Sequence, residues 1–177
     1  MFHKILVAID RSEVSRQGFE VTLSLAKATG VSLLLLHILS LDDEESPHMP
    51  VLFGQDFYPR SSSQSVVQIY EELWKAYEER GMALLQALAD VATDNGIQTE
   101  FTQGVGSAGS MICEFARHSG VDLIILGRRG CSGFNELILG SVSNYVLHYA
   151  PCSVLLIRRQ PNPTLDTTLD QQVATVS

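Results

Sequence analysis

Short aliphatic runs recur along the chain and are separated by longer segments with helical periodicity. Four such runs occupy residues 5–9, 33–36 with Ile38, 123–126 and 154–157. Runs of this length and composition are typical of strands that are covered on both faces, as in a parallel sheet. A fifth segment, residues 97–102, alternates apolar with polar side chains and predicts an edge strand with one solvent-exposed face.

Helical repeats fill the intervals between these runs. The apolar residues that carry them are Val14, Val21 and Leu25; Leu73, Trp74, Tyr77, Leu84, Leu85, Leu88 and Val91; Met111, Ile112 and Phe115; and Val142, Tyr145, Val146 and Tyr149. Gly120 is expected to end the third helix and Pro151 the fourth. This alternation predicts an α/β fold, an open five-stranded parallel sheet in the order 3-2-1-4-5 with helices on both faces, similar to the Rossmann fold.

Such sheets bind ligands outside the carboxyl ends of their strands. Any functional site is therefore expected in the segments that follow Ile9, Ile38, Gln103 and Leu126.

Length and composition indicate one globular domain. The chain has 177 residues, 45% of them hydrophobic and 18% charged, which is ordinary for a folded domain. We place this domain at residues 1–159. Within it, residues 40–65 carry an acidic run, prolines and a serine cluster, and we interpret them as a mobile insertion. Residues 160–177 lose aliphatic density and are expected to form a disordered tail.

The net charge of the chain disfavours some classes of binding partner. Twelve Lys and Arg against 20 Asp and Glu give a net charge of −8, which disfavours binding to nucleic acid or to an anionic membrane. No apolar run is long enough to cross a bilayer, and neither a signal-peptide layout nor paired cysteine spacing is present. We therefore expect a cytoplasmic protein with reduced thiols. The histidine spacing predicts no metal site built from protein ligands.

A split glycine motif follows the fourth predicted strand. It consists of Gly127, Gly130 and, after nine intervening residues, Gly140 with Ser141. Glycines let backbone amides approach an anion closely, and the start of a helix offers further unpaired amides. None of the three lysines lies in this region, so phosphates would be held by amides and hydroxyls, including that of Ser143. The alternative is a glycine-rich turn and a capped helix that bind nothing.

These residues resemble the motif of the universal stress protein family. The family motif is G-x2-G-x9-G-[ST], and Gly127, Gly130, Gly140 and Ser141 match it position by position. Residues 7–10 are similar to the family's first strand, and residues 35–38 to the end of its second strand. The resemblance covers residues 2–158.

The resemblance implies a five-stranded parallel sheet, a dimer and the binding of ATP. It implies that Asp10 and Ile38 line the adenine and ribose, and that Leu126 and Gly127 continue that wall. Ala8 stands where ATP-binding members carry proline. The residues predicted to bind the nucleotide are Ala8, Ile9, Asp10, Ile38, Leu126, Gly127, Arg129, Gly130, Gly140, Ser141, Val142 and Ser143.

Two of the neighbouring residues have a second interpretation. An acid directly after a strand often caps the next helix, and Ser12 competes with Asp10 for that role. Cys131 lies beside two arginines, whose charge would favour a reactive thiolate and a redox role. Cys113 and Cys152 are interpreted as packing residues.

A second glycine pattern keeps a dehydrogenase open. Gly104, Gly106 and Gly109 read G-x-G-x-x-G between a predicted strand and a helix. No acid follows the next strand, but the arginines there could accept a 2′-phosphate, which would suit an NADP-dependent oxidoreductase. The simpler interpretation is that this loop borders the same crevice.

We predict an ATP-binding sensor or adaptor of the stress response rather than an enzyme. Hydrolysis needs a residue that orients water or takes its proton, and only Asp10 and Glu136 are candidates. A slow ATPase is the alternative. ADP or AMP could replace ATP as the ligand, and Mg²⁺ would arrive with the phosphates.

The last strand predicts a homodimer. Val154, Leu155, Leu156 and Ile157 are all apolar, although the order 3-2-1-4-5 places them at an edge of the sheet. An exposed apolar edge favours pairing with the same edge of a second copy. An adaptor also needs another protein as a partner, which the sequence does not identify.

Overall fold

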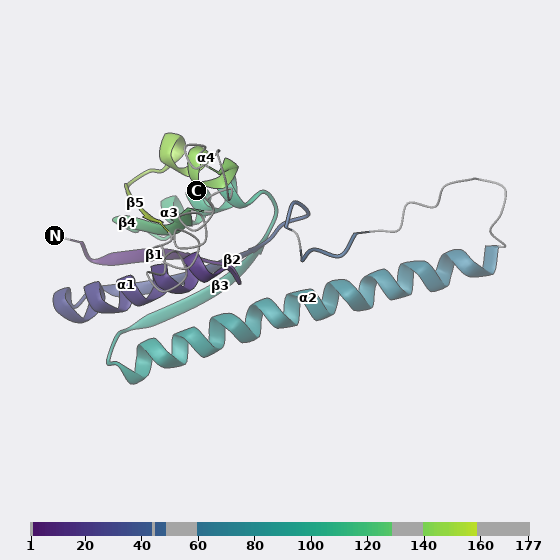
Figure 1. Cartoon of the computed structure of the whole chain (residues 1–177), viewed down its shortest axis with the longest axis horizontal. Coiled ribbons are helices and arrows are strands. Elements are labelled where there is room, and N and C mark those ends of the chain that lie inside the picture. Colours follow the sequence, from purple (N-terminus) through teal and green to yellow (C-terminus); the bar gives the residue numbers. More distant parts are fainter. Residues whose placement is uncertain (1, 44, 49–59, 129–139, 159–177) are drawn as a thin grey trace, which may run out of the picture.

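The described part of the chain is built around one parallel sheet. A computed structural model describes residues 2–43, 45–48, 60–128 and 140–158. The strands are β1 (Lys4–Ile9), β2 (Ser32–Leu39), β3 (Thr99–Val105), β4 (Leu123–Arg128) and β5 (Ser153–Arg158). They lie parallel in the order β3-β2-β1-β4-β5, which confirms the predicted fold class and strand order (Figure 1).

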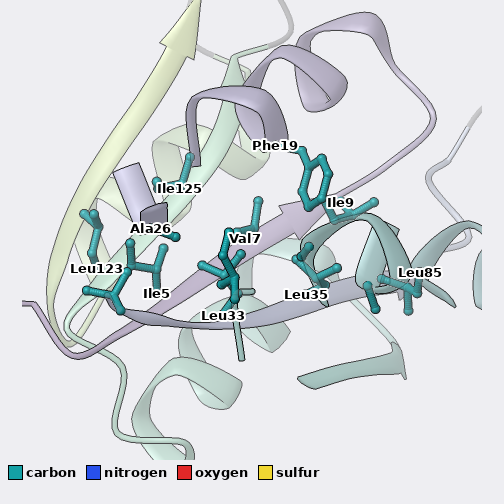
Figure 2. Close-up of a cluster of buried hydrophobic side chains, with 14 residues drawn as sticks. Ile5, Val7, Ile9, Phe19, Ala26, Leu33, Leu35, Leu85, Leu123 and Ile125 are labelled. Atoms are coloured by element: carbon teal, nitrogen blue, oxygen red, sulfur yellow. The ribbon is translucent and has the colours of Figure 1, made fainter. Parts of the chain in front are cut away.

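Helices cover both faces of this sheet. α1 (Glu13–Thr29) and α2 (Arg60–Asp94) pack on one face, and α3 (Ala108–His118) and α4 (Ser141–Tyr149) pack on the other. Alternate residues of β1, β2 and β4 therefore enter two separate cores. Figure 2 shows the first core, where Ile5, Val7 and Ile9 of β1 meet Phe19 of α1 and Leu85 of α2.

Local sequence explains where α1 begins and ends. The Ser12 hydroxyl accepts a hydrogen bond from the Ser15 amide at 3.2 Å and so caps the first turn. Such a cap stabilises a helix by about 1 kcal/mol. Gly30 follows the last turn with a φ of +71°, a left-handed conformation that favours glycine.

α2 is longer than its apolar stripe predicts. It begins at Arg60, within the segment 40–65 expected to be an insertion, and runs for 35 residues. Its second half packs on the sheet, whereas its first half extends past it (Figure 1). Leu73, at the start of the predicted stripe, is accordingly 52% exposed. Despite the length of α2, no helix in the described ranges is both long and apolar enough to cross a bilayer.

β3 is shifted along the chain relative to the predicted strand at 97–102. Ile97 belongs to the turn that ends α2, where its amide donates to the Ala92 carbonyl at 3.1 Å. β3 then continues to Val105, in register with Leu39 of β2. It is an edge strand, as its alternating pattern predicts, and β5 is the other edge. The predicted tail at 160–177 lies outside the described residues.

Candidate functional site

A cleft of about 360 Å³ opens at the carboxyl edge of the sheet, where sequence reasoning expects a site. The ends of β1, β2 and β4 and the first turns of α3 and α4 surround it. Its lining consists of Ala8, Ile9, Asp10, Leu36, Ile38, Ser40, Asp42, Asp43, Ser107, Ala108, Gly109, Ile112, Leu126, Gly127, Gly140, Ser141, Val142, Ser143 and Tyr145. Every predicted site residue is among them except Arg129 and Gly130, which lie outside the described residues.

The inner part of the cleft is apolar. Leu36, Ile38, Ile112 and Leu126 line it, and each is at most 8% exposed. Leu36 and Ile112 are absent from the predicted set. Leu36 could have been found, since it lies two residues before Ile38 on the same face of β2.

The first turn of α4 supplies hydrogen-bond donors to the cleft. α4 starts after Gly140, whose carbonyl accepts from the Asn144 amide at 2.9 Å. No side-chain hydrogen bond caps this helix in the described part of the chain. The amides of Ser141, Val142 and Ser143 have no acceptor within the helix. They carry the partial positive charge of a helix N-terminus and can hold an anion there.

Gly127 has a packing role in addition to its place in the motif. A Cβ atom at this position would lie 2.8 Å from Val14 Cγ1 and 3.2 Å from the Ser15 amide nitrogen. A side chain here would therefore push α1 away from the end of β4. The glycine keeps α1 close to the sheet and leaves the backbone at the end of β4 uncovered toward the cleft.

Asp10 and Ser12 divide the roles that the sequence left open. Ser12 caps α1, while one oxygen of Asp10 accepts hydrogen bonds from the Ser12 amide, at 2.8 Å, and from the Ser12 hydroxyl. The Asp10 amide in turn donates to Ser15 Oγ at 3.0 Å. Asp10 thus supports the turn between β1 and α1 and also presents a fixed carboxylate to the cleft.

The loop after β2 adds polar residues that sequence reasoning missed. Ser40, Asp42 and Asp43 line the cleft beside Ile38. The Tyr77 hydroxyl of α2 donates to Asp43 Oδ2 at 3.0 Å. The available signal was an acidic run directly after a buried strand, which we had interpreted as part of a mobile insertion.

The second glycine pattern borders this same cleft. Ser107, Ala108 and Gly109 line it at the start of α3. Gly104 belongs to β3, and Gly106 adopts a φ of +144°, which only glycine adopts readily. The loop therefore borders the same cleft, as its simpler interpretation predicts.

His37 lies behind the cleft, against α2. Burial lowers its pKa, while the carboxylates of Asp43, Asp10 and Glu45 act in the opposite direction. Its Nδ1 is 3.0 Å from Gln103 Nε2, and because an amide nitrogen only donates, Nδ1 is the acceptor of a neutral ring. His37 does not line the cleft, so it is not placed to act as a base on a ligand there.

A smaller polar pocket of about 220 Å³ lies beside His37. Its lining is Arg11, Ser12, His37, Asp43, Glu45, Tyr77, Arg80 and Gly81. Arg11 and Glu45 form an ion pair at 2.6 Å across it. Asp43 therefore separates two cavities.

Neither cysteine in the described ranges has the features of a reactive thiol. Burial raises the pKa of Cys113 and of Cys152, which favours the inert protonated form. Cys131 lies outside the described residues. Within the described ranges, no group of three or more His, Cys, Asp and Glu side chains is arranged to hold a metal ion.

Solved structures share this fold. MJ0577 superposes with a TM-score of 0.68 at 23% identity, covering 92% of this chain and 99% of that protein. The Arabidopsis thaliana protein At3g01520, with AMP bound, gives a TM-score of 0.57 at 19% identity and 91% and 97% coverage. The universal stress protein of Archaeoglobus fulgidus, in complex with dAMP, gives 0.51 at 19% identity and 88% and 97% coverage.

Curated relatives match over almost the same range. Universal stress protein Sll1388 of Synechocystis sp. is 30% identical over 157 residues, which cover 89% of this chain and 98% of the relative. Universal stress protein YxiE of Bacillus subtilis is 32% identical over 158 residues, covering 89% and 100%. The model of the universal stress protein family matches residues 1–158. Fold and sequence agree, and the chain belongs to the universal stress protein family.

Proposed function

We propose that the cleft binds an adenine nucleotide, preferentially ATP, and that the protein acts as a nucleotide-responsive sensor or adaptor. The observation that carries the proposal is the position of the glycine motif. Gly127, Gly140 and Ser141 line the same cleft, whose inner part is apolar. Structural neighbours described with AMP and with dAMP support an adenine nucleotide as the ligand.

The phosphates are assigned to the start of α4. Ser141 and Ser143 add hydroxyls to the free amides of this turn. Hydrogen bonds to a charged acceptor contribute about 1.5–3 kcal/mol each, so a few of them suffice to hold a polyphosphate. Arg129 and Gly130 complete this phosphate-binding set in the proposal.

The base is assigned to the apolar part of the cleft. Ile38 and Leu126 provide walls for a flat aromatic group. Ala8, Ile9 and Asp10, at the end of β1, line the same cleft. Mg²⁺ would be brought by the nucleotide phosphates rather than held by a preformed set of protein ligands.

A sensor fits the cleft better than an efficient enzyme does. His37, which precedes the lining residue Ile38, lies outside the lining, and one oxygen of Asp10 already accepts two hydrogen bonds from Ser12. Neither His37 nor that oxygen of Asp10 is therefore poised to take a proton from water. A slow ATPase stays the second candidate, because Asp10 does face the cleft.

We also propose a homodimer through β5. This strand is an edge of the sheet, and Leu155 is 38% exposed on it. Pairing of two β5 strands would cover this apolar edge.

Isothermal titration of the nucleotide-free protein with ATP and Mg²⁺ tests the proposed function. We expect a micromolar Kd, equivalent to about −8 kcal/mol. Gly140→Asp places a carboxylate where the phosphates would lie and should weaken binding at least a hundredfold. Ser24→Asp adds the same charge on the exposed face of α1 and serves as the control. Absence of binding to the unaltered protein would disprove the nucleotide site.

A further inference from the structure

Asp43 lies where a ribose-binding acid is expected. In dinucleotide-binding α/β folds, an acid at the carboxyl end of a neighbouring strand accepts a hydrogen bond from a ribose hydroxyl. Asp43 follows the end of β2 at Leu39 by four residues and lines the cleft together with Ile38. This places a carboxylate on the β2 side of the cleft.

Tyr77 holds this carboxylate in place. Its hydroxyl donates to Asp43 Oδ2 at 3.0 Å, and the Glu45 amide lies 3.4 Å from Oδ1. Tyr77 is 3% exposed, and burial followed by the bond to Asp43 raises its pKa to about 12, so it stays a donor. Each oxygen of a carboxylate has two lone pairs, so each can accept one further donor from a ligand.

The strand order separates this carboxylate from the phosphate end. Asp43 follows β2, whereas the donors of Gly140 and Ser141 lie beyond β4. β1 lies between these strands, so two strand spacings, about 10 Å, separate the ends. A nucleotide has hydroxyl donors on its ribose and acceptors on its phosphates. The ribose donors match the carboxylate after β2, and the phosphate acceptors match the donors at the start of α4.

We propose that Asp43, positioned by Tyr77, selects ribonucleotides over 2′-deoxyribonucleotides by accepting hydrogen bonds from the ribose hydroxyls. The inference rests on the proposed function, because it gives a specificity to the same cleft. Asp43 is favoured over Asp10 because of how their hydrogen bonds are distributed. Each oxygen of Asp43 accepts one hydrogen bond, whereas one oxygen of Asp10 already accepts two from Ser12. The fold neighbour from A. fulgidus is described in complex with dAMP, so this selectivity has to come from particular residues of this chain.

Dissociation constants of ATP and 2′-deoxy-ATP, measured by calorimetry on the full nucleotide-free chain, test the proposal. Loss of one hydrogen bond to a charged acceptor predicts about tenfold weaker binding of the deoxynucleotide. Asp43→Ala should weaken ATP binding by about that factor more than it weakens 2′-deoxy-ATP binding, and so bring the ratio close to one. Tyr77→Phe removes only the hydroxyl that positions Asp43 and should lower the ratio a fewfold.

Two control variants match these substitutions. Glu45→Gln removes a carboxylate from the same loop, and Tyr70→Phe removes a hydroxyl from the same helix. Neither residue lines the cleft, and both variants should keep the ratio of the unaltered protein. If Asp43→Ala does not fold, Asp43→Asn keeps the shape of the side chain and should still lower the ratio.

The outcomes separate this inference from the function on which it rests. Equal affinities of the unaltered protein for the two nucleotides, or a ratio that survives Asp43→Ala, would overturn the specificity and leave the nucleotide site standing. Failure of both nucleotides to bind would overturn both proposals.

Discussion

At the scale of residues, the shape of the cleft depends on two glycines, which have no side chain. The motif glycine Gly127 lets the backbone of α1 approach to contact distance, and Gly140 leaves the start of α4 open. The spacing of these glycines could be read from the sequence because the motif is local. Asp43 and Tyr77 could not be paired in the same way, since 34 positions separate them and only the course of α2 brings them together.

Two glycine substitutions test this account of packing. In Gly127→Ala the new Cβ would lie within 3.2 Å of backbone atoms of Val14 and Ser15, so we expect a loss of about 1–3 kcal/mol in the free energy of unfolding. In Gly18→Ala the nearest atom, in Ile157, is 3.7 Å away, so better helix propensity should give a gain of up to about 1 kcal/mol. Urea denaturation measures both, and an equally stable Gly127→Ala variant would contradict the packing role.

His37 predicts how stability depends on pH. Burial lowers its pKa in the folded state below the ordinary value of 6.5, so the unfolded chain binds more protons as the pH falls through 6.5. The free energy of unfolding should therefore decrease between pH 7.5 and pH 5.5. His37→Gln should reduce this decrease, while His118→Gln, at an exposed histidine, should not. Urea titrations at several pH values measure the effect, and an unchanged pH dependence in His37→Gln would contradict it.

At the scale of elements, periodicity predicts type and order well and boundaries less well. The buried strands β1, β2 and β4 consist of unbroken aliphatic runs and were located almost without error. The predicted start of β3 was two residues too early because Ile97 is apolar but belongs to the turn after α2. The alternation of apolar and polar residues along a strand does not reveal such a role. The start of α2 was missed because its first turns consist mainly of polar residues, which form no apolar stripe.

The edge strand β5 predicts that the protein forms a dimer. We expect a dimer by light scattering coupled to size exclusion, because β5 presents an apolar edge. Leu155→Lys places like charges opposite each other across the two-fold axis and should increase the dissociation constant of the dimer at least tenfold. Val105→Lys introduces the same charge on the opposite edge strand β3, where Val105 is 62% exposed, and should leave the dimer intact. A monomeric unaltered protein would contradict the interface.

At the scale of the whole molecule, the sheet gathers segments from every part of the chain at one edge. Asp10, Ile38 and Gly140 are far apart in the sequence but lie around one cleft because their strands and helix end or begin there. The parallel order alone predicts this convergence. It does not predict the acidic side of the cleft, which depends on how the loop after β2 folds back onto Tyr77.

Amide chemical shifts recorded while ATP is added to the nucleotide-free protein test the central claim most directly, because they locate the ligand residue by residue. We predict the largest shifts at Asp10, Gly127, Gly140 and Ser141, at the carboxyl edge of the sheet. The amides of Gly30, Gly96 and Gly120, in the turns after α1, α2 and α3, should stay in place. Shifts that gather at those turns, or no shifts at saturating ATP, would contradict a nucleotide site in this cleft.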